Sequence, residues 1–386
     1  MFDKFFVDYM ANIIPVSFNL KFKNETTKIG KGEPLFTVTL RNPIPKSELL
    51  TSTSLALGEA YMRGDIEVDK DLYEVLNLFL GEMGKFTTNK KKLRSLLYTA
   101  TNKVNQKKEV TSHYDIGNDF YSLWLDETMS YSCGYFKEEN NTLYEAQMNK
   151  IHHILDKLFL QPGMKLLDIG CGWGALLMEA AKKYQVKGTG ITLSKEQYNK
   201  FSERIKEEKL EDYLTVKIMD YRDLSDTDYQ FDRVVSVGML EHVGRENYGL
   251  FMKSVHHVLK SKGVFLLHTI TALKEHPGDA WIKKYIFPGG MIPSLRELIF
   301  LLPDYQFYTL DVESLRRHYN RTLLCWRRRF LSHKEEIIKM MGEEFTRMWE
   351  LYLASCAATF NNGIIDIHQI LLSKGPANDL PMTRVV

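Results

Sequence analysis

Residues Leu167–Gly174 read Leu-Asp-Ile-Gly-Cys-Gly-Trp-Gly, and this stretch decides the fold of the chain. An apolar run, Met164–Ile169, leads into the glycines, and an apolar-periodic helix, Ala175–Tyr184, follows them. A strand, a tight glycine turn and a helix form the first unit of a doubly wound α/β domain. Glycines let the backbone approach a ligand closely, and the helix N-terminus offers unpaired N–H groups to an anion. The turn therefore predicts a site for a cofactor with an anionic end.

The spacing of the glycines separates this turn from the one that dinucleotide enzymes use. The pattern is Gly170-x-Gly172-x-Gly174, not Gly-x-Gly-x-x-Gly, and an acid, Asp168, precedes the turn. This arrangement resembles motif I of class I S-adenosylmethionine methyltransferases. A purely structural strand–helix turn is the alternative interpretation.

The bulk composition is that of a folded protein without a strong charge bias. The chain has 386 residues, 44% of them hydrophobic, and a formal net charge of +2. This length favours two domains, and the near balance of charges gives no reason to expect nucleic acid as a partner. The four cysteines lack metal-ligand spacing, so we expect no zinc site and a reducing cytoplasm. We also expect neither a signal peptide nor a membrane span.

The first 84 residues predict a small mixed α+β domain. A helix with one apolar face ends near Pro15, and that face either packs on its own domain or docks on lipid. Alternating and periodic patterns then predict two strands and two helices, Ser17–Phe22, Leu35–Leu40, Ser52–Arg63 and Leu72–Met83. Residues 85–110 are polar and basic, which indicates a linker whose charges are solvated or face anionic headgroups.

Residues 111–386 predict the catalytic domain, in which strands and helices alternate. The strands expected after Ile169 are Lys187–Leu193, Leu214–Met219, Phe231–Val237, Gly263–Ile270, Gln306–Asp311 and Ile364–Leu372. Regular β–α spacing implies a parallel sheet with ligands at the carboxyl ends of its strands. The residues at those ends are Gly170, Thr192, Asp220, Glu241 and His268. A helical insertion is expected over about 312–360, and Pro288–Pro293 is expected to form a loop or lid.

Several motifs in one order resemble the cyclopropane-fatty-acyl-phospholipid synthases and the related mycolic acid cyclopropane synthases. The motifs are His113-Tyr114-Asp115, Tyr131-Ser132-Cys133-Gly134-Tyr135-Phe136, Leu167–Gly174, Gly190-Ile191-Thr192-Leu193-Ser194 with Gln197, Glu241-His242-Val243-Gly244, and His318-Tyr319 before Arg321-Thr322-Leu323. The resemblance implies a class I methyltransferase (Rossmann-like) fold, a doubly wound seven-stranded α/β sheet with a smaller N-terminal domain.

The resemblance also implies how S-adenosylmethionine is held. Most class I methyltransferases place an acid after the second strand, whereas this chain has Thr192-Leu193-Ser194 there. In the family that it resembles, this stretch and the loop after the third strand hold the ribose and adenine. The cofactor contacts implied for this chain are Tyr114, Tyr131, Ser132, Gly170, Gly172, Thr192, Leu193, Gln197, Tyr221 and Arg222.

Ring closure on an alkene needs a base, because methyl transfer leaves a carbocation beside the new methyl group. On residue type and position alone, Glu241 and His268 are the candidate bases. The family resemblance instead implies a bound bicarbonate, held by Glu241, His268, Tyr319 and backbone groups of Cys133 and Ile270. Each residue also has a structural interpretation, as a turn cap, a core histidine or a packed tyrosine. We expect the backbone of Cys133 to matter more than its thiol.

The expected function is cyclopropane fatty acid synthesis, in which a methylene unit passes from S-adenosylmethionine to cis double bonds of phospholipid acyl chains. The alternatives are a fatty-acyl methyltransferase giving a methyl-branched product, a small-molecule methyltransferase, and a binding module without turnover. We expect an apolar tunnel walled by Pro288–Pro293 and Leu295–Leu302. We also expect a homodimer that binds the inner face of the membrane peripherally, through arginines of the insertion or the basic linker.

Overall fold

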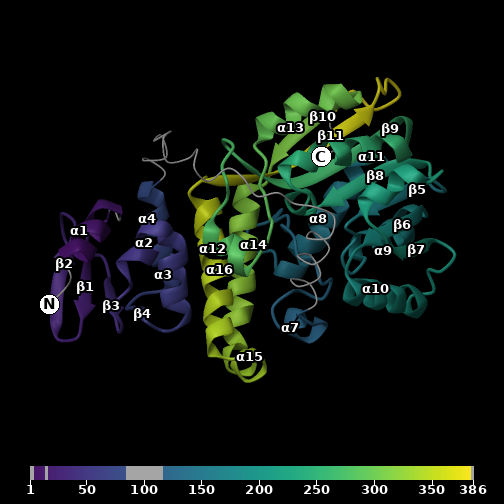
Figure 1. Cartoon of the computed structure of the whole chain (residues 1–386). Helices are drawn as coiled ribbons and strands as arrows, with labels where there is room; N and C mark the ends of the chain where they lie inside the picture. Colours follow the sequence, from purple (N-terminus) through teal and green to yellow (C-terminus); the bar gives the residue numbers. More distant parts are fainter. Residues whose placement is uncertain (1–3, 14–15, 84–115, 384–386) are drawn as a thin grey trace. The chain divides into compact units, whose positions relative to one another are not determined.

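The computed structural model describes residues 4–13, 16–83 and 116–383. These residues form two compact units (Figure 1). The N-terminal unit contains the chain up to α4 together with two later segments, Pro277–Pro288 and Leu323–Ile365. The second unit, here called the sheet unit, contains the chain from α7 to His276 together with Gly289–Thr322 and the residues from Asp366 onward.

The N-terminal unit is built on a four-stranded sheet in the order β2-β1-β3-β4. Its strands are β1 (Phe18–Phe22), β2 (Glu25–Ile29), β3 (Thr37–Leu40) and β4 (Ile66–Val68). Its helices are α1 (Lys4–Ile13), α2 (Lys46–Thr51), α3 (Thr53–Met62), α4 (Leu72–Met83), α12 (Ala280–Tyr285), α15 (Lys334–Met341) and α16 (Glu343–Asn361). The sequence patterns locate β1, β3, α3 and α4 but miss three short elements, because β2 is mostly polar and β4 and α2 have only three and six residues.

The apolar face of α1 packs inside its own unit. Phe6 and Met10 are buried in one core cluster with Phe18, Leu20 and Leu49. Of the two interpretations of this face, packing within the domain therefore holds for these two side chains. Burial of large apolar side chains of this kind contributes about 2 kcal/mol each.

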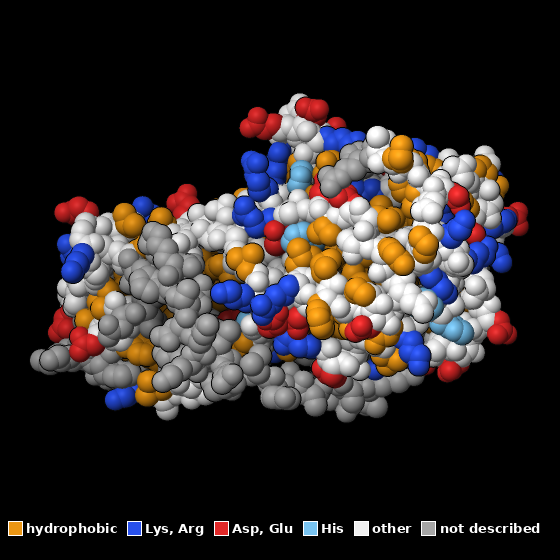
Figure 2. All heavy atoms as spheres, turned by 90° about the horizontal axis from the view of Figure 1, so that it is seen from above, with side chains coloured by type: hydrophobic (Ala, Val, Ile, Leu, Met, Phe, Trp, Pro, Cys, Tyr) orange, Lys and Arg blue, Asp and Glu red, His pale blue; other side chains and the backbone are white. Residues whose placement is uncertain are grey.

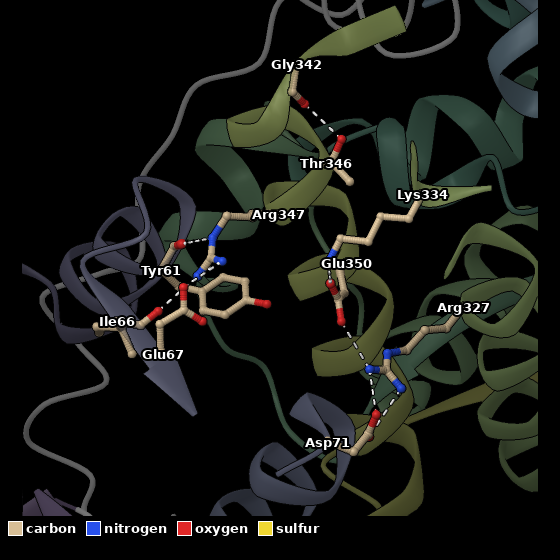
Figure 3. A network of polar contacts seen from close by, with 10 residues as sticks. All are labelled: Tyr61, Ile66, Glu67, Asp71, Arg327, Lys334, Gly342, Thr346, Arg347 and Glu350. Carbon is tan, nitrogen blue, oxygen red and sulfur yellow. Dashed lines mark hydrogen bonds and ion pairs between the residues drawn. The ribbon is translucent and has the colours of Figure 1, made fainter. Parts of the chain in front are cut away.

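The late helices contact the rest of the N-terminal unit through ion pairs of two buried arginines, drawn in Figure 3. The guanidinium of Arg347 on α16 donates to the carbonyl of Ile66 at 2.9 Å and pairs with Glu67 at 3.1 Å. Arg327 bridges Asp71 at 2.8 Å and Glu350 at 3.1 Å. Residues more than 250 positions apart in the sequence thus form one unit. The expected boundaries at 84 and 110 fall at residues outside the described part of the chain, so that division remains a proposal.

The sheet unit has a seven-stranded sheet in the order β10-β11-β9-β8-β5-β6-β7, which confirms the predicted class I methyltransferase fold. The central strands are parallel, and β10 is antiparallel to β11. The strands are β5 (Lys165–Ile169), β6 (Lys187–Thr192), β7 (Leu214–Ile218), β8 (Phe231–Val237), β9 (Leu259–Ala272), β10 (Phe307–Ser314) and β11 (Ile365–Lys374). The alternation of strands and helices in the sequence predicts each of them within a few residues.

Helices cover both faces of this sheet, as Figure 1 shows. One core cluster joins the sheet to α8 (Leu143–Lys157), α9 (Ala175–Tyr184) and α10 (Lys195–Glu207). The other joins it to α11 (Tyr248–Val258) and α13 (Leu295–Leu301). The remaining helices are α7 (Asn118–Ser122), the short 3-10 helices η2 (Tyr221–Asp226), η3 (Leu240–His242), η4 (Arg245–Asn247) and η5 (Leu302–Tyr305), and α14 (Arg316–Ser332), which spans the boundary between the units. Among the described residues, no helix combines the length and hydropathy of a membrane span.

Candidate active site

The glycine turn after β5 is shaped as the sequence predicts. Gly170 and Gly174 have φ of +83° and +87°, a backbone conformation that side chains disfavour. A Cβ on Gly174 would lie 2.1 Å from ring carbons of Phe201, so the turn has no room for one. Gly174 is also the N-cap of α9, and its conformation turns the chain into that helix. The first N–H groups of α9, which have no acceptor within the helix, therefore lie directly at the turn.

The segment after β6 is ordered by its own side chains. The Thr192 hydroxyl donates to Oε1 of Gln197 at 2.7 Å and accepts from the N–H of Ser194 at 3.2 Å. The Ser194 hydroxyl caps α10 by accepting from the N–H of Gln197. These bonds fix the Thr-Leu-Ser turn at the strand end where other class I methyltransferases place an acid. Both Thr192 and Gln197 are buried.

One cavity lies at the carboxyl ends of β5, β6 and β8, and most of the expected cofactor contacts line it. Those that line it are Tyr131, Ser132, Gly170, Gly172, Thr192, Leu193, Gln197 and Tyr221. Tyr114 lies outside the described residues. Arg222 does not line the cavity, because its guanidinium makes two hydrogen bonds to the carboxylate of Asp220, at 2.8 and 2.7 Å. The structure thus brings eight of the ten expected contacts to one place.

Aromatic rings form one wall of this cavity. The ring of Tyr131 lies 5.3 Å from that of Trp124 in an edge-on arrangement, and 5.7 Å from that of Tyr121. Trp173, from the glycine turn, lies 5.4 Å from Tyr121 and donates its indole N–H to Asn118 at 2.8 Å. Such a wall is apolar but carries polar groups at fixed positions, as small-molecule sites do.

Two buried ionisable residues that are not among the expected cofactor contacts also line the cavity, and of these the sequence singles out only Asp168. Lys150 on α8 donates to the Ser132 hydroxyl at 3.0 Å, and burial lowers the pKa of its amine to about 8. Burial raises the pKa of Asp168 to about 7, although the nearby Lys150 opposes this shift. A lysine inside an otherwise ordinary amphipathic helix gives no local signal. Only the tertiary structure places it at the cavity.

The expected base region lies at the end of β8 and along the last residues of β9, next to the cavity but not in its lining. Oε1 of Glu241 accepts the backbone N–H of Ile270 at 2.6 Å. The N–H of Ile270 lies past the end of β8, so the carboxylate supplies the acceptor that a longer neighbouring strand would have provided. Oε2 of Glu241 is buried and has no hydrogen-bond partner among the described residues. Burial raises the pKa of Glu241 to about 7.

His268 precedes Ile270 by two residues on β9, so the two side chains lie on the same face of the strand. Its ring is fully buried, and Nδ1 accepts from the side-chain amide of Gln369 at 3.2 Å. Nε2 has no hydrogen-bond partner among the described residues. Burial and the charges of Lys150 and Lys157 lower the pKa of His268 to about 3. The ring is therefore neutral at physiological pH.

Cys133 and Tyr319, the other expected catalytic residues, both contact the backbone carbonyl of Leu315. The Cys133 thiol lies 3.8 Å from the carbonyl of Leu315, to which the N–H of Tyr319 donates at 3.0 Å. Burial raises the pKa of the Cys133 thiol, which disfavours the nucleophilic thiolate. The structure thus joins Glu241 to Ile270 directly and Cys133 to Tyr319 through a shared backbone group. The roles of all five expected catalytic residues remain proposals.

The loop expected to wall a tunnel is tied to the base region. The N–H of Met291 donates to the backbone carbonyl of Glu241 at 2.8 Å, and the hydroxyl of Tyr248 donates to the carbonyl of Met291 at 3.0 Å. The N–H of Ala272, at the end of β9, donates to the carbonyl of Pro293. These contacts place the loop beside Glu241.

Two family models match this chain. The model described as "Mycolic acid cyclopropane synthetase" covers residues 101–370. The model described as "Domain of unknown function (DUF7884)" covers residues 5–91. The first match includes the glycine turn, the cavity and the base region, whereas the second lies in the N-terminal unit.

Curated relatives and solved structures agree with the first match. The chain is 39% identical over 359 residues to "Cyclopropane-fatty-acyl-phospholipid synthase" of Escherichia coli (strain K12), covering 90% of each chain. It is 38% identical over 361 residues to "Probable fatty acid methyltransferase" of Pseudomonas putida, covering 91% of each. The structure of the mycolic acid cyclopropane synthase CmaA1 complexed with SAH and CTAB matches with a TM-score of 0.66 and 38% identity, over 69% of this chain and 98% of that one.

Proposed function

We propose that this chain, which belongs to the mycolic acid cyclopropane synthetase family of S-adenosylmethionine-dependent methyltransferases, transfers a methylene unit to cis double bonds in acyl chains of unsaturated phospholipids. The observation that carries the proposal is the pair of buried polar atoms without partners, Oε2 of Glu241 and Nε2 of His268, beside the cofactor cavity. Several other buried polar atoms among the described residues also lack a partner, but these two belong to side chains connected through β9, because Glu241 accepts the N–H of Ile270 two residues after His268. Buried polar atoms are normally hydrogen-bonded, so this pair indicates a site for a polar group.

The glycine turn and the Thr192–Gln197 segment hold the cofactor in this proposal. The N-terminus of α9 would hold the methionyl carboxylate, because its N–H groups and the helix dipole favour an anion. Thr192 and Gln197 line the part of the cavity at the end of β6, and they replace the missing acid as contacts to the nucleoside. The aromatic wall excludes water from the sulfonium methyl group. An isolated alkene is a weak nucleophile, so catalysis depends on holding it in line with this methyl group.

The residues around Glu241 fit the proposed bicarbonate. The ion has both acceptors and a hydroxyl donor, and it would supply the base that removes a proton from the new methyl group. A neutral imidazole donates from Nε2 and a protonated Glu241 donates from Oε2, so both orphaned atoms match a small oxyanion. We propose Glu241, His268, Tyr319 and backbone groups of Cys133 and Ile270 as its holders. The N–H of Ile270 already donates a hydrogen bond to Glu241, so in this proposal it positions the carboxyl group of Glu241.

The substrate chain is proposed to enter from a membrane surface to which the protein binds peripherally, at the cytoplasmic face and as a homodimer. Exposed apolar side chains support the proposed membrane contact: Phe300 on α13 is 84% exposed and Leu273 is 72% exposed. The side chain of Arg296, on the same helix as Phe300, is 71% exposed and is paired with the carboxylate of Glu275, so it could contact a lipid headgroup only from the edge of that ion pair. Figure 2, seen from above, shows hydrophobic side chains interspersed with basic and some acidic ones on this face of the sheet unit. Apolar groups beside cations suit an anionic lipid surface.

A methyl-branched product is the second candidate, and the similarity to the Pseudomonas putida relative favours it. Both products would arise from one carbocation, so they differ only in which proton leaves. The experiment that separates them is product analysis with purified protein, S-adenosylmethionine and vesicles of unsaturated phospholipid, followed by gas chromatography of the fatty acid methyl esters.

We expect cyclopropane acyl chains from these vesicles and no product from matched vesicles of saturated phospholipid. Branched chains alone would establish the second candidate. Turnover of a soluble substrate at the same rate with and without vesicles would instead indicate a small-molecule methyltransferase and overturn the proposal. Cofactor binding without turnover of any of these substrates would indicate a binding module.

A further inference from the structure

A chain of buried polar side chains lies behind His268, on the side away from Nε2. Nδ1 of His268 faces the amide nitrogen of Gln369 at 3.2 Å, and Oε1 of Gln369 accepts from Nζ of Lys157 at 2.8 Å. Lys157 also contacts the carboxylate of Glu313, which bonds Nε2 of His153 at 2.6 Å. None of these four supporting residues lines the cofactor cavity.

Adjacent elements of the sheet unit build this chain. His268, Gln369 and Glu313 come from β9, β11 and β10, which are neighbours in the sheet, and Gln369 lies directly opposite Glu313 in the ladder. Lys157 and His153 lie one turn apart on α8. Gln369 and Lys157 are nearly fully buried, with exposures of 1% and 5%. Such a network holds its members in fixed rotamers because its neighbours leave no other space.

The chemistry of Lys157 fixes the orientation of Gln369. An ammonium group has three donors and no acceptor, so the amide atom that faces it must be the oxygen. The amide nitrogen of Gln369 must then face His268, and its N–H donates to Nδ1. Although burial raises it, hydrogen bonds from His153 and Lys157 hold the pKa of Glu313 at about 2, so an anion keeps Lys157 in place.

The orientation of Gln369 decides where the proton of His268 lies. A neutral imidazole carries one proton, and a ring nitrogen that accepts a hydrogen bond cannot hold it. We propose that Lys157 and Gln369 lock His268 in the tautomer with its proton on Nε2, so that the ring donates a hydrogen bond to the reaction centre and does not act as the base. This inference rests on the proposed function for the identity of the acceptor, but the tautomer itself does not depend on it. Lys157 and Gln369 are positioning residues.

The hydrogen bonds from Lys157 to Gln369 and from Gln369 to His268 also explain why residue 369 is an amide and not an acid. A carboxylate at this position would accept a hydrogen bond from both neighbours and draw the proton to Nδ1. A ring with its only proton on Nδ1 would present a bare lone pair at Nε2 to an anionic group, which is repulsive. Holding a histidine in the wrong tautomer costs on the order of 10²–10⁴-fold in rate in enzymes that depend on it.

The test is ¹⁵N NMR of the histidine rings in the full-length protein without substrate, with the His268 signals assigned by their absence in His268→Gln. We expect a protonated Nε2 and an unprotonated Nδ1 in the wild-type protein. The nearly isosteric Gln369→Glu should show a protonated Nδ1. At alkaline pH the ring of His268 keeps a single proton. Under these conditions the kcat of the Gln369→Glu protein for lipid should fall roughly 10²-fold, with its KM for S-adenosylmethionine unchanged.

Two further variants test the lysine. Lys157→Met frees the amide of Gln369 to rotate, so both tautomers should appear, whereas Lys157→Arg restores the donor and the single tautomer. His152→Gln, on the same helix but paired with Glu179, should leave the His268 signals unchanged. A wild-type ring protonated on Nδ1, or a Gln369→Glu protein with the wild-type tautomer and full kcat, would overturn the lock. Because the NMR signals need no substrate, failure of the lock is distinguishable from failure of the proposed reaction.

Discussion

The two units differ in how their buried ionisable side chains are paired. In the N-terminal unit, the side chains of Arg327, Arg347 and Glu350 are about 10% exposed and each has an ion-pair partner (Figure 3), although Nε of Arg327 makes no hydrogen bond among the described residues. In the sheet unit, Glu241 and His268 are as deeply buried, yet each keeps one polar atom without a partner among the described residues. A paired buried charge offsets its desolvation, whereas an unpaired polar atom leaves a cost in free energy.

This difference separates structural groups from functional ones. Removing one partner from the N-terminal unit creates a new unpaired charge, so it should cost stability. Removing an orphaned group from the sheet unit relieves an existing cost, so it should cost activity and not stability. Perturbed pKa values alone would not make this distinction, since both structural and catalytic groups show them.

The largest effect should follow from Glu241→Gln in the sheet unit. Glutamine can still accept the N–H of Ile270, but it cannot ionise or exchange a proton with an anion at the site. We expect ring formation on phospholipid vesicles to fall roughly 10²–10⁴-fold, while the affinity for S-adenosylmethionine, measured by calorimetry, stays the same. The matched control is Glu203→Gln, a carboxylate on α10 whose side chain is 55% exposed. Equal rates in both variants would remove Glu241 from the mechanism.

The next effect should come from Arg327→Met in the N-terminal unit. The substitution leaves the buried carboxylate of Glu350 with Lys334 at 3.4 Å as its remaining ion-pair partner. Leaving a buried charge without any partner costs about 3–5 kcal/mol, and because Lys334 still faces Glu350 we expect a loss at the lower end of this range, which urea denaturation would measure as a lower free energy of unfolding. Arg41→Met is the control, because its pair with Glu67 is 3.7 Å long and exposed. A loss below about 1 kcal/mol for Arg327→Met would contradict the comparison.

Glu241 also predicts a pH dependence of stability. Its pKa in the folded protein is about 7, above its ordinary value of 4.5, so the folded state keeps a proton that the unfolded state has released. Its contribution to stability therefore falls as pH rises from about 4.5 to 7 and stays low above that. Glu241→Gln lacks this loss and should be more stable than the wild type by about 3 kcal/mol at pH 8. Urea denaturation between pH 5.5 and 8 should show that the difference in free energy of unfolding between the variant and the wild type becomes smaller at lower pH. A difference that does not change with pH would contradict the raised pKa of Glu241.

The smallest effect should come from an exposed pair. Lys262 and Asp379 lie 3.0 Å apart, but their side chains are 57% and 78% exposed. Solvent screens such a pair, so Lys262→Met should change the free energy of unfolding by less than about 0.5 kcal/mol. The same urea denaturation provides the measurement, and a loss of about 2 kcal/mol would show that burial is not what separates the strong pairs from the weak ones.

The sequence by itself determined the sheet unit almost completely. Leu167–Gly174 and the alternation of apolar strands with amphipathic helices are local patterns, and local patterns follow from φ/ψ preferences and side-chain periodicity. The expected cofactor contacts came from the family resemblance, and strand-end reasoning located only Gly170 and Thr192 among them, since parallel strands collect their carboxyl ends at one edge. Short or polar elements such as β2 and β4 were missed because they carry too few residues for periodicity to register.

Only the tertiary structure decided which groups lack partners. Lys150 reaches the cavity from a helix whose sequence gives no sign of it, and Gln369 meets His268 across 101 residues and Lys157 across 212. Such pairs depend on strand order and on how helices pack over the sheet, which no window of neighbouring residues encodes. The sequence therefore located Glu241 and His268 at strand ends, whereas the fold decided that the imidazole would be neutral, buried and aligned by an amide.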